Sequence, residues 1–555
     1  MLGNVTAGGM MAGKRGRRFE DAERGYLVER VGTLAARGLP ERTIARRLSI
    51  SKGIVGTLKK EAVTAALSGS SPVSSPAWAH VRELDASVPK GTVQRFVVGM
   101  AGWGPLPVPF LDNLWAFAAH KRAEFFVGGD PKHARQCPGE LRPYFCPDRV
   151  RLNDSLLFVG HGGNADAVEP LKDHVSANRG QHVVVAHPRF ALQSIPRMLD
   201  APPRYAVSTG AVTFPAVDAS VKALQHHALG ALLIEVDADG ECFFHQISAY
   251  GDGSFQCLDE FVADGRVHGG RRVRAVTWGD AHHAIMQRAI GIASFGYDRA
   301  AHAVVGGDSL LDTLQPEDQF FSDLVHFGDR NTHVISDPVR MAQSFHAGRG
   351  NIEAEIAAAA GFVNMCRRDW TRVHLKEGNH ERKLVKWLKD SKGRSDPENA
   401  YYYHRLNAVM HSRIRETRGA WRETRIVEHA LREAGLADDV EFRYRDRSCV
   451  IDGVELGVHS DKGIKGSPGS PAQFRKHGGR ITLDHPHTPW ACEGVYVAGT
   501  TGEIYQGYND GWTTDAHAHV VQYHGGHRAL VLMASDGRHR ATADLPDPCP
   551  SPAGA

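Results

Sequence analysis

The spacing of apolar residues divides the chain into three patterns. Between residues 26 and 60 they recur every three or four positions, which predicts short helices. Between residues 95 and 248, RFVVGMAG, EFFVGG and HVVVAHP predict buried strands, FLDNLWAFAAHKRA predicts a helix after the first of them, and Asp239-Gly240 predicts a hairpin turn. From residue 271 onward, strand, polar turn and helix alternate. This alternation predicts an α/β protein.

The N-terminal pattern resembles a helix-turn-helix. Ile44, Ala45 and Leu48 share one helical face, and a second helix with its own apolar face is expected from about Ser51 to Lys60. In such a motif the second helix enters the major groove of DNA, where basic side chains contact phosphates. The candidate DNA-binding residues are Lys52, Lys59 and Lys60. The alternative is a helical assembly module whose lysines are only solvated.

Changes in composition suggest where domains begin and end. The segment SGSSPVSSP contains almost only Ser and Pro, which is typical of a linker, and the C-terminal end is rich in Pro. The predicted organisation is a helical head over residues 1–67, a linker over 68–91, an α/β accessory domain over 92–270, a main domain over 271–540 with a basic helical insertion at 382–447, and a disordered tail over 541–555.

Composition narrows the class of protein. The chain has 555 residues, of which 42% are hydrophobic and 23% charged, as in soluble globular proteins. No apolar run is long enough for a membrane span and no signal peptide is evident, so we expect a cytoplasmic protein without a membrane partner. The net charge of +3 does not by itself require a nucleic-acid partner. However, 20 of the 31 histidines fall between His282 and His539, and imidazole is a common metal ligand.

Several predicted strands of this histidine-rich region end in residues that can bind metal ions, which is where open α/β sheets place their sites. These candidate metal ligands are Asp280, His282, Asp329, Asn379, His459, His485 and His487. Seven ligands are too many for one tetrahedral zinc ion but suit two cations that share one carboxylate. The mixture of oxygen and nitrogen ligands favours Mn, and Fe or Zn are alternatives. Two such cations can activate water for hydrolysis of a phosphoester.

The order D-x-H, G-D, G-N-H-E, H and H-x-H resembles the calcineurin-like metallophosphoesterase superfamily, in its recombination-repair-nuclease branch. The resemblance covers about residues 273–535 and implies an αββα sandwich. It also implies that Asp280, His282, Asp329 and His487 hold one metal ion, and that Asp329, Asn379, His459 and His485 hold the other. Asp329 would then bridge the two. The sequence departs from the family pattern at Asp484, where glycine is usual, and in Arg330-Asn331-Thr332-His333.

The same resemblance suggests catalytic residues beside the ligands. His380 matches the family position that faces the substrate, where an imidazole can stabilise the transition state or protonate the leaving group. His333, four residues after Asp329, is a second candidate because a histidine follows the bridging aspartate in the repair nucleases; its alternative is a solvent-exposed histidine. Glu381 is expected either to orient a neighbouring histidine or to cap the next helix.

Two basic segments indicate the type of phosphoester. Residues 461–480 combine glycines with basic side chains, which suits contacts with phosphates. The candidate substrate-binding residues are Lys462, Lys465 and Arg475. Residues 382–447 are also basic and contain three consecutive tyrosines at 401–403, a combination that can bind a nucleic-acid strand. Both segments can equally be ordinary solvated surface.

A further resemblance concerns segments such as HPRFALQSIPRM (187–198), STGAVTFP (208–215) and HSDKGIKGSPGS (459–470). They look like a family of tailed-phage pre-early proteins associated with DNA transfer and host-DNA degradation. This likeness implies a phage-encoded DNA nuclease acting in the bacterial cytoplasm as a homo-oligomer. The alternatives are a phosphomonoesterase or nucleotidase acting on a small substrate, and a DNA-binding regulatory or assembly protein that keeps the metal site without turnover.

Overall fold

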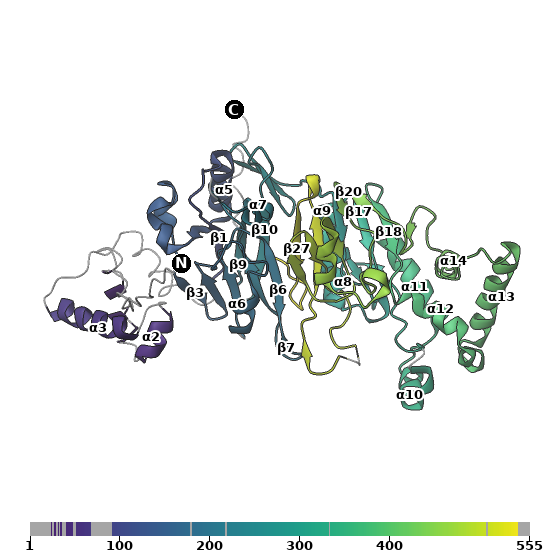
Figure 1. The fold of residues 1–555 in the computed structure, drawn as a ribbon. Helices are drawn as coiled ribbons and strands as arrows, with labels where there is room; N and C mark the ends of the chain where they lie inside the picture. The colour runs from purple at the N-terminus through teal and green to yellow at the C-terminus, as the bar shows by residue number, and fades with distance from the viewer. Residues whose placement is uncertain are drawn as a thin grey trace, which may run out of the picture. The chain divides into compact units, whose positions relative to one another are not determined.

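A computed structural model of the chain has two compact units, Met1–His80 and Val81–Ala555 (Figure 1). The structure describes residues 24, 27–28, 31–32, 34–35, 40–47, 52–67, 92–177, 180–216, 219–331, 334–506 and 509–541. The predicted linker and tail lie outside the described residues, apart from Ala541.

The first unit contains the two helices predicted from the apolar spacing, α2 (Glu41–Arg47) and α3 (Lys52–Leu67). Their apolar faces meet in a small core that consists of Leu27, Val31, Ile44, Val55 and Leu58. The three lysines of the predicted DNA-binding helix are exposed on α3. The apolar spacing therefore predicts where both helices begin, but α3 continues to Leu67, beyond the expected end at Lys60.

A six-stranded sheet forms the centre of the second unit. Its order is β19-β18-β17-β14-β26-β27, in which the first four strands are parallel and the last two antiparallel to their neighbours. The strands are β14 (Ala275–Thr277), β17 (Asp318–Phe321), β18 (Arg372–Lys376), β19 (Glu441–Arg443), β26 (Ala518–Gln522) and β27 (Arg528–Leu532). The parallel strands place their carboxyl ends at one edge of the sheet.

A ten-stranded sheet crosses the predicted domain boundary at residue 270. In sheet order it comprises β20 (Val450–Ile451), β21 (Val454–Glu455), β22 (Arg480–Leu483), β24 (Val495–Val497), β23 (Trp490–Cys492), β6 (Ala191–Ile195), β8 (Arg204–Ser208), β5 (His182–Val185), β4 (Leu156–Val159) and β3 (Arg149–Asn153). The two halves join where β23 pairs with β6, with Ala491 opposite Leu192. Residues 92–270 and 271–540 thus build one sheet within one compact unit.

A four-stranded sheet completes the N-terminal part of this unit. Its order is β10-β9-β1-β2, with β1 (Gln94–Met100), β2 (Glu124–Gly128), β9 (Gly230–Val236) and β10 (Cys242–Ser248). The predicted strand, helix and strand are present: α5 (Val108–Lys121) connects β1 to the parallel β2. The predicted hairpin also is present, because β9 and β10 pair antiparallel around Gly240, whose φ of 86° favours glycine.

Smaller elements surround these sheets. The short strands are β7 (Arg197–Met198), β11 (Phe255–Cys257), β12 (Glu260–Ala263), β13 (Arg266–His268), β15 (Tyr297–Asp298), β16 (Ala303–Val304) and β25 (Trp512–Thr513). The remaining helices are α6 (Lys172–Ala177), α7 (Val221–Gln225), α8 (Arg288–Phe295), α9 (Leu310–Leu314), α10 (Pro338–His346), α11 (Ile352–Met365), α12 (Glu381–Lys389), α13 (Ala400–Glu416), α14 (Arg425–Glu433) and α15 (Pro471–Phe474). No described helix has the length and apolar content needed to cross a membrane.

The large cores show how these layers pack. One face of the six-stranded sheet packs against α8, α9, α11, α12, α13 and α14 (Figure 1). The last three helices lie within or at the start of the predicted insertion at 382–447, but this segment also contains β19, a strand of the same sheet. The other face shares a second core with the other large sheets, in which Val520 and Leu530 of the six-stranded sheet meet Leu192 and Val207 of the ten-stranded sheet. The protein therefore has the α/β architecture that the alternation predicts.

We expect Leu192→Ala to lower the free energy of unfolding of the second unit by about 2–5 kcal/mol. Leu192 is 1% exposed and lies in the core where the two halves of the ten-stranded sheet join. Thermal and denaturant unfolding of the full chain would measure the loss. Leu224→Ala is the matched control, because Leu224 is 49% exposed, and it should change stability by less than about 0.5 kcal/mol. Equal effects of the two substitutions would contradict the importance of this join.

Candidate metal centre

The parallel strands of the six-stranded sheet deliver polar side chains to one place. Thr277 of β14 pairs with Phe320 of β17, and the carboxylates Asp280 and Asp323 each come three residues after these paired positions. Asn379 follows the end of the next strand, β18. Because equal offsets from paired residues reach the same level of the sheet edge, Asp280 and Asp323 lie in one buried cluster.

Asp323, and not Asp329, is the carboxylate that the structure places in this cluster. Asp329 lies further along the same loop, where its carboxylate accepts hydrogen bonds from Ser344 and Arg349 and is partly exposed. It belongs to none of the groups of close ligand atoms among the described residues. The prediction that Asp329 bridges two metal ions is therefore wrong in its residue, because the Gly-Asp dipeptide at 328–329 falls beyond the end of β17.

One group of potential ligands contains Asp280, His282 and His487. The Nε2 atoms of His282 and His487 lie 3.0 Å apart, and His487 Nε2 is 3.2 Å from Asp280 Oδ2. His282 is fully buried, and its Nδ1 has no hydrogen-bond partner. Three side chains therefore direct lone pairs or protons toward one small volume.

A second group contains Asp280, Asp323, His459 and His485. His459 Nε2 lies 2.9 Å from Asn379 Oδ1 and 3.5 Å from Asp323 Oδ2. Asp323 Oδ2 is buried and forms no hydrogen bond. Asp280 is common to this group and to the first, so the two groups adjoin.

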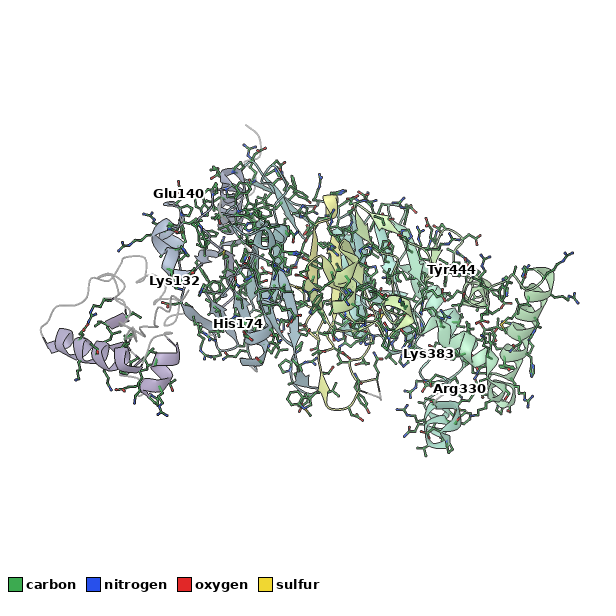
Figure 2. All side chains as sticks on the ribbon, viewed as in Figure 1. Lys132, Glu140, His174, Arg330, Lys383 and Tyr444 are labelled. Carbon is green, nitrogen blue, oxygen red and sulfur yellow. The ribbon has the colours of Figure 1, made fainter. Side chains whose placement is uncertain are left out.

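A third group brings His282 together with His326 and His380. The ring of His380 is centred 4.4 Å from that of His282, and the ring of His326 is 5.3 Å from it. His326 Nδ1 is buried without a partner. His380 is held from two sides: its backbone amide donates to Asp323, and Lys383 Nζ of α12 lies 2.9 Å from its ring nitrogens. Lys383 is labelled in Figure 2.

These groups fit the binding of metal ions. Buried carboxylates and imidazoles normally have hydrogen-bond partners, yet His282 Nδ1, Asp323 Oδ2 and His326 Nδ1 have none. Burial and the nearby His380 lower the pKa of His282 well below its usual value, which keeps the imidazole in the neutral form that binds metals. The protein therefore has a buried His/Asp cluster that could hold metal ions.

Asp484, where the sequence departs from the metallophosphoesterase pattern, supports one of these histidines. Its Oδ1 accepts a hydrogen bond of 2.8 Å from His459 Nδ1, which directs Nε2 of the same ring into the cluster. Ser322 donates to its Oδ2, and the fully buried ammonium of Lys376 also contacts Asp484. Burial raises the pKa of Asp484, but Lys376 and His459 outweigh this effect and lower it to about 2. A carboxylate behind a ligating imidazole fixes its tautomer and orientation.

Glu381 stabilises the loops that carry the cluster. Its buried carboxyl group accepts hydrogen bonds from the backbone amides of Leu324 and Gly378, which join the loop after β17 to the loop after β18. Burial and the negative charge of Asp323 raise the pKa of Glu381 to about 8. The sequence predicts that Glu381 either orients a neighbouring histidine or caps the next helix. In the structure its carboxyl group instead joins two backbone segments.

The remaining predicted site residues are one histidine and six basic side chains. His333 belongs to the undescribed residues. Lys462 and Lys465 are exposed, whereas Arg475 is ion-paired with Glu493 and Glu169. Lys52, Lys59 and Lys60 belong to the first unit.

Sequence analysis missed two residues of the cluster, Asp323 and His326. The residues S-D-L-V-H directly follow β17, DQFF, but two of the four residues of this strand are polar, so the apolar pattern does not mark where the strand ends. The six predicted ligands other than Asp329 all contribute to the cluster or contact it: Asp280, His282, Asn379, His459, His485 and His487.

We expect Asp323→Asn to weaken Mn²⁺ binding more than about tenfold, because it removes a buried charge that faces the ligand nitrogens. Isothermal titration of the full chain with Mn²⁺ would measure this loss. Asp329→Asn is the matched control and should bind Mn²⁺ like the unmodified protein. A larger loss of Mn²⁺ affinity in Asp329→Asn than in Asp323→Asn would show that Asp329 is the ligand.

We expect Asp484→Asn to reduce Mn²⁺ affinity by about 10–100-fold, the usual cost of losing the partner behind a ligating histidine. The substitution keeps the size of the side chain but removes the charge that Lys376 and His459 contact. Lys376→Met combined with Asp484→Asn removes the unpaired buried ammonium, so it separates loss of orientation from loss of folding in thermal unfolding. Unchanged Mn²⁺ affinity in Asp484→Asn would show that this carboxylate does not position His459.

Comparison with known proteins places the chain among phage proteins. It is 32% identical over 421 residues to Protein A1 of Escherichia phage T5, and the alignment covers 73% of each chain. No family model matches the sequence, and no solved structure matches it. Both the share of the chain that is matched and the level of identity exceed what an isolated motif would produce. The chain therefore belongs to the family of Protein A1 of Escherichia phage T5.

Proposed function

We propose that this protein is a phage-encoded metallophosphoesterase that hydrolyses phosphodiester bonds of DNA with two divalent metal ions, most plausibly Mn. The observation that carries the proposal is the buried cluster at the carboxyl ends of β14, β17 and β18, in which two groups of ligands share Asp280. The proposal includes a calcineurin-like αββα sandwich, which the order of motifs in the sequence supports.

The two groups of ligands divide between two cations. Asp280, His282 and His487 would hold one, and Asp323, His459, His485 and Asn379 would hold the other. Asp280 belongs to both groups, and Asp323 influences histidines of both: burial raises its pKa, but His459, His380 and His282 lower it well below its usual value. When bound, two such cations supply Lewis-acid activation of the phosphate and of the attacking water.

Two histidines of the cluster are suited to act on the substrate. His380 and His326 face His282 but are not needed to complete either ligand group. A neutral imidazole at this position can stabilise the charge that develops on the phosphate or protonate the departing oxygen. Lys383 keeps His380 in place through contacts with its ring nitrogens. His326 follows Asp323 by three residues, so in this proposal His326, in place of His333, is the histidine after the metal-binding aspartate that contacts the phosphate.

DNA is the substrate that the surrounding surface favours. Lys462 and Lys465 are exposed in the loop after His459, and basic helices follow His380 along the chain. Exposed cationic side chains neutralise phosphates, and this supplies most of the affinity for a nucleic-acid backbone. Arg475 is less suited to this role because its guanidinium is paired with Glu493. Membership of a phage family favours action in the cytoplasm of the bacterial host, and we extend the proposal to a homo-oligomeric assembly.

Two other functions use the same cluster differently. A phosphomonoesterase or nucleotidase would hydrolyse a small chromogenic monoester and leave DNA intact. A DNA-binding regulatory or assembly protein would bind metal ions and DNA without hydrolysis. The ligand set described above is complete enough for turnover, which favours an enzyme.

We expect the full chain to cleave linear duplex DNA in the presence of Mn²⁺, and His380→Ala to lower the rate at least about 100-fold. The measurement is gel analysis of linear and closed circular DNA, with bis(p-nitrophenyl) phosphate and p-nitrophenyl phosphate as small substrates. Cleavage of linear DNA alone would indicate attack from ends, whereas cleavage of circles would indicate internal cutting.

His411→Ala is the matched control, because His411 is exposed on α13 and contacts no ligand of the cluster. It should cleave DNA at the unmodified rate. Hydrolysis of the monoester without cleavage of DNA would favour the nucleotidase alternative. Binding of Mn²⁺ without any hydrolysis would favour the regulatory or assembly alternative.

A further inference from the structure

A cavity lies in the helical insertion that follows His380. Its volume is about 220 Å³, and it is lined by residues of α13 and α14, by Trp421 between these helices and by Tyr444, which follows β19. Tyr444 is labelled in Figure 2. Three arginines line it, together with two aromatic side chains and a histidine. These residues are Arg413, Trp421, Arg425, His429, Arg432 and Tyr444.

The size of the cavity suits one aromatic ring with a substituent. A cavity of about 150 Å³ accommodates a benzene molecule, so 220 Å³ admits a somewhat larger ring such as a nucleobase. Trp421 and Tyr444 provide the flat apolar surfaces on which bases stack in proteins that bind single strands. The Arg425 guanidinium lies over the Tyr444 ring, 5.8 Å from its centre, so the flexible Arg425 side chain must move aside or stack on the base when a base contacts this face.

The charges around the cavity favour an anionic ligand. Three arginines face one carboxylate, Glu428, which accepts a hydrogen bond from Tyr444 Oη and lies 3.6 Å from Arg432. Arg432 also donates to the carbonyl of Val440 at 2.6 Å, so it holds the wall together. Arg413 and Arg425 instead are exposed at the surface. Arg413 lies 3.1 Å from Glu416 in an exposed ion pair, a weak contact that a phosphate can replace.

One residue of the cavity wall carries a buried polar atom without a hydrogen-bond partner in the protein. His429 Nε2 is inaccessible to solvent and forms no hydrogen bond, although His429 lines the cavity. A buried ring nitrogen without a partner costs free energy unless a ligand supplies one. The carbonyl and amino groups of a nucleobase are suitable partners.

We propose that this cavity binds one nucleotide of a single DNA strand, with the base inside against Trp421 and Tyr444 and the phosphate outside at Arg413 and Arg425. The inference rests on the proposed function, because it gives the nuclease a second contact with its substrate. The insertion begins with α12 immediately after His380, and α12 packs against α13 and α14. A nucleotide held here would fix the position of the strand relative to the metal centre.

The test is fluorescence anisotropy of a labelled dT12 oligonucleotide with the full chain in EDTA, where metal-dependent cleavage cannot occur. We expect Arg413→Gln/Arg425→Gln to weaken binding about tenfold or more. The matched control is Arg415→Gln/Arg418→Gln, which removes two exposed arginines that do not line the cavity. It should weaken binding less than about threefold. Thermal unfolding of both variants would verify that they fold equally well.

A second variant, His429→Leu, tests the interior of the cavity without changing its charged rim. It should weaken dT12 binding several-fold, and Val409→Leu at the same wall is its size control. Competition by free dTMP separates the two sources of a nucleotide: competition at millimolar concentration assigns free nucleotides as ligands as well, and its absence restricts the cavity to strands. Both results support a nucleotide site.

Equal binding of dT12 by the cavity variant and its control would overturn the proposal, as would the absence of dT12 and dTMP binding by the unmodified protein. Neither result depends on hydrolysis, since EDTA is present throughout. Failure of the nuclease proposal is recognised separately by lack of DNA cleavage with Mn²⁺, and in that case selective loss of dT12 binding would still establish the cavity as a nucleotide site.

Discussion

The burial of negative carboxylates next to imidazoles at one edge of a parallel sheet is the constraint on which the second unit depends. Asp280 and Asp323 are almost completely inaccessible to solvent, and removal of such charges from water costs several kcal/mol each. Part of this cost is offset by hydrogen bonds from Ser322 to Asp280 and from the His380 amide to Asp323. The remainder requires positive charge, which bound cations would supply. The surrounding loops are accordingly held by Glu381 and by the contact between Lys376 and Asp484.

The ten-stranded sheet determines where the distant ligands of this cluster lie. His459 follows β21, and His485 and His487 follow β22, so the position of both loops depends on strands that pair in parallel. The same sheet continues through β23 into β6, which belongs to the N-terminal half of the unit. The accessory region therefore shares its core with the region of the metal centre and stabilises it through Leu192 and Ala491.

The helical insertion contacts the His/Asp cluster at one end and contains the arginine-lined cavity at the other. Its first helix, α12, begins beside His380 and carries Lys383, which contacts that histidine. Its later helices form the cavity lined by arginines and aromatic side chains. Residues in an insertion of this kind can vary without changing the loops that carry the His/Asp cluster, so the insertion can add a ligand contact of its own.

The sequence by itself determined the α/β class and six of the residues of the His/Asp cluster that could hold metal ions. The alternation of strands and helices is a local property. D-x-H and H-x-H each place two candidate ligands within three residues, and G-N-H-E places Asn379 directly before His380. The Gly-Asp dipeptide at 328–329 matches the metallophosphoesterase pattern, so the sequence predicts Asp329 as a metal ligand. The position of Asp323 in the cluster instead depends on the pairing of Thr277 with Phe320.

Only the tertiary structure decided which distant segments meet. The pairing of β23 with β6 joins residues about 300 positions apart, and no local pattern around residue 270 indicates that the sheet continues across it. The same holds for the role of Asp484, which looks like a departure from a motif in the sequence but lies behind His459 in the fold. Local patterns specify elements and their polar ends, and pairing between distant strands specifies which of those ends become neighbours.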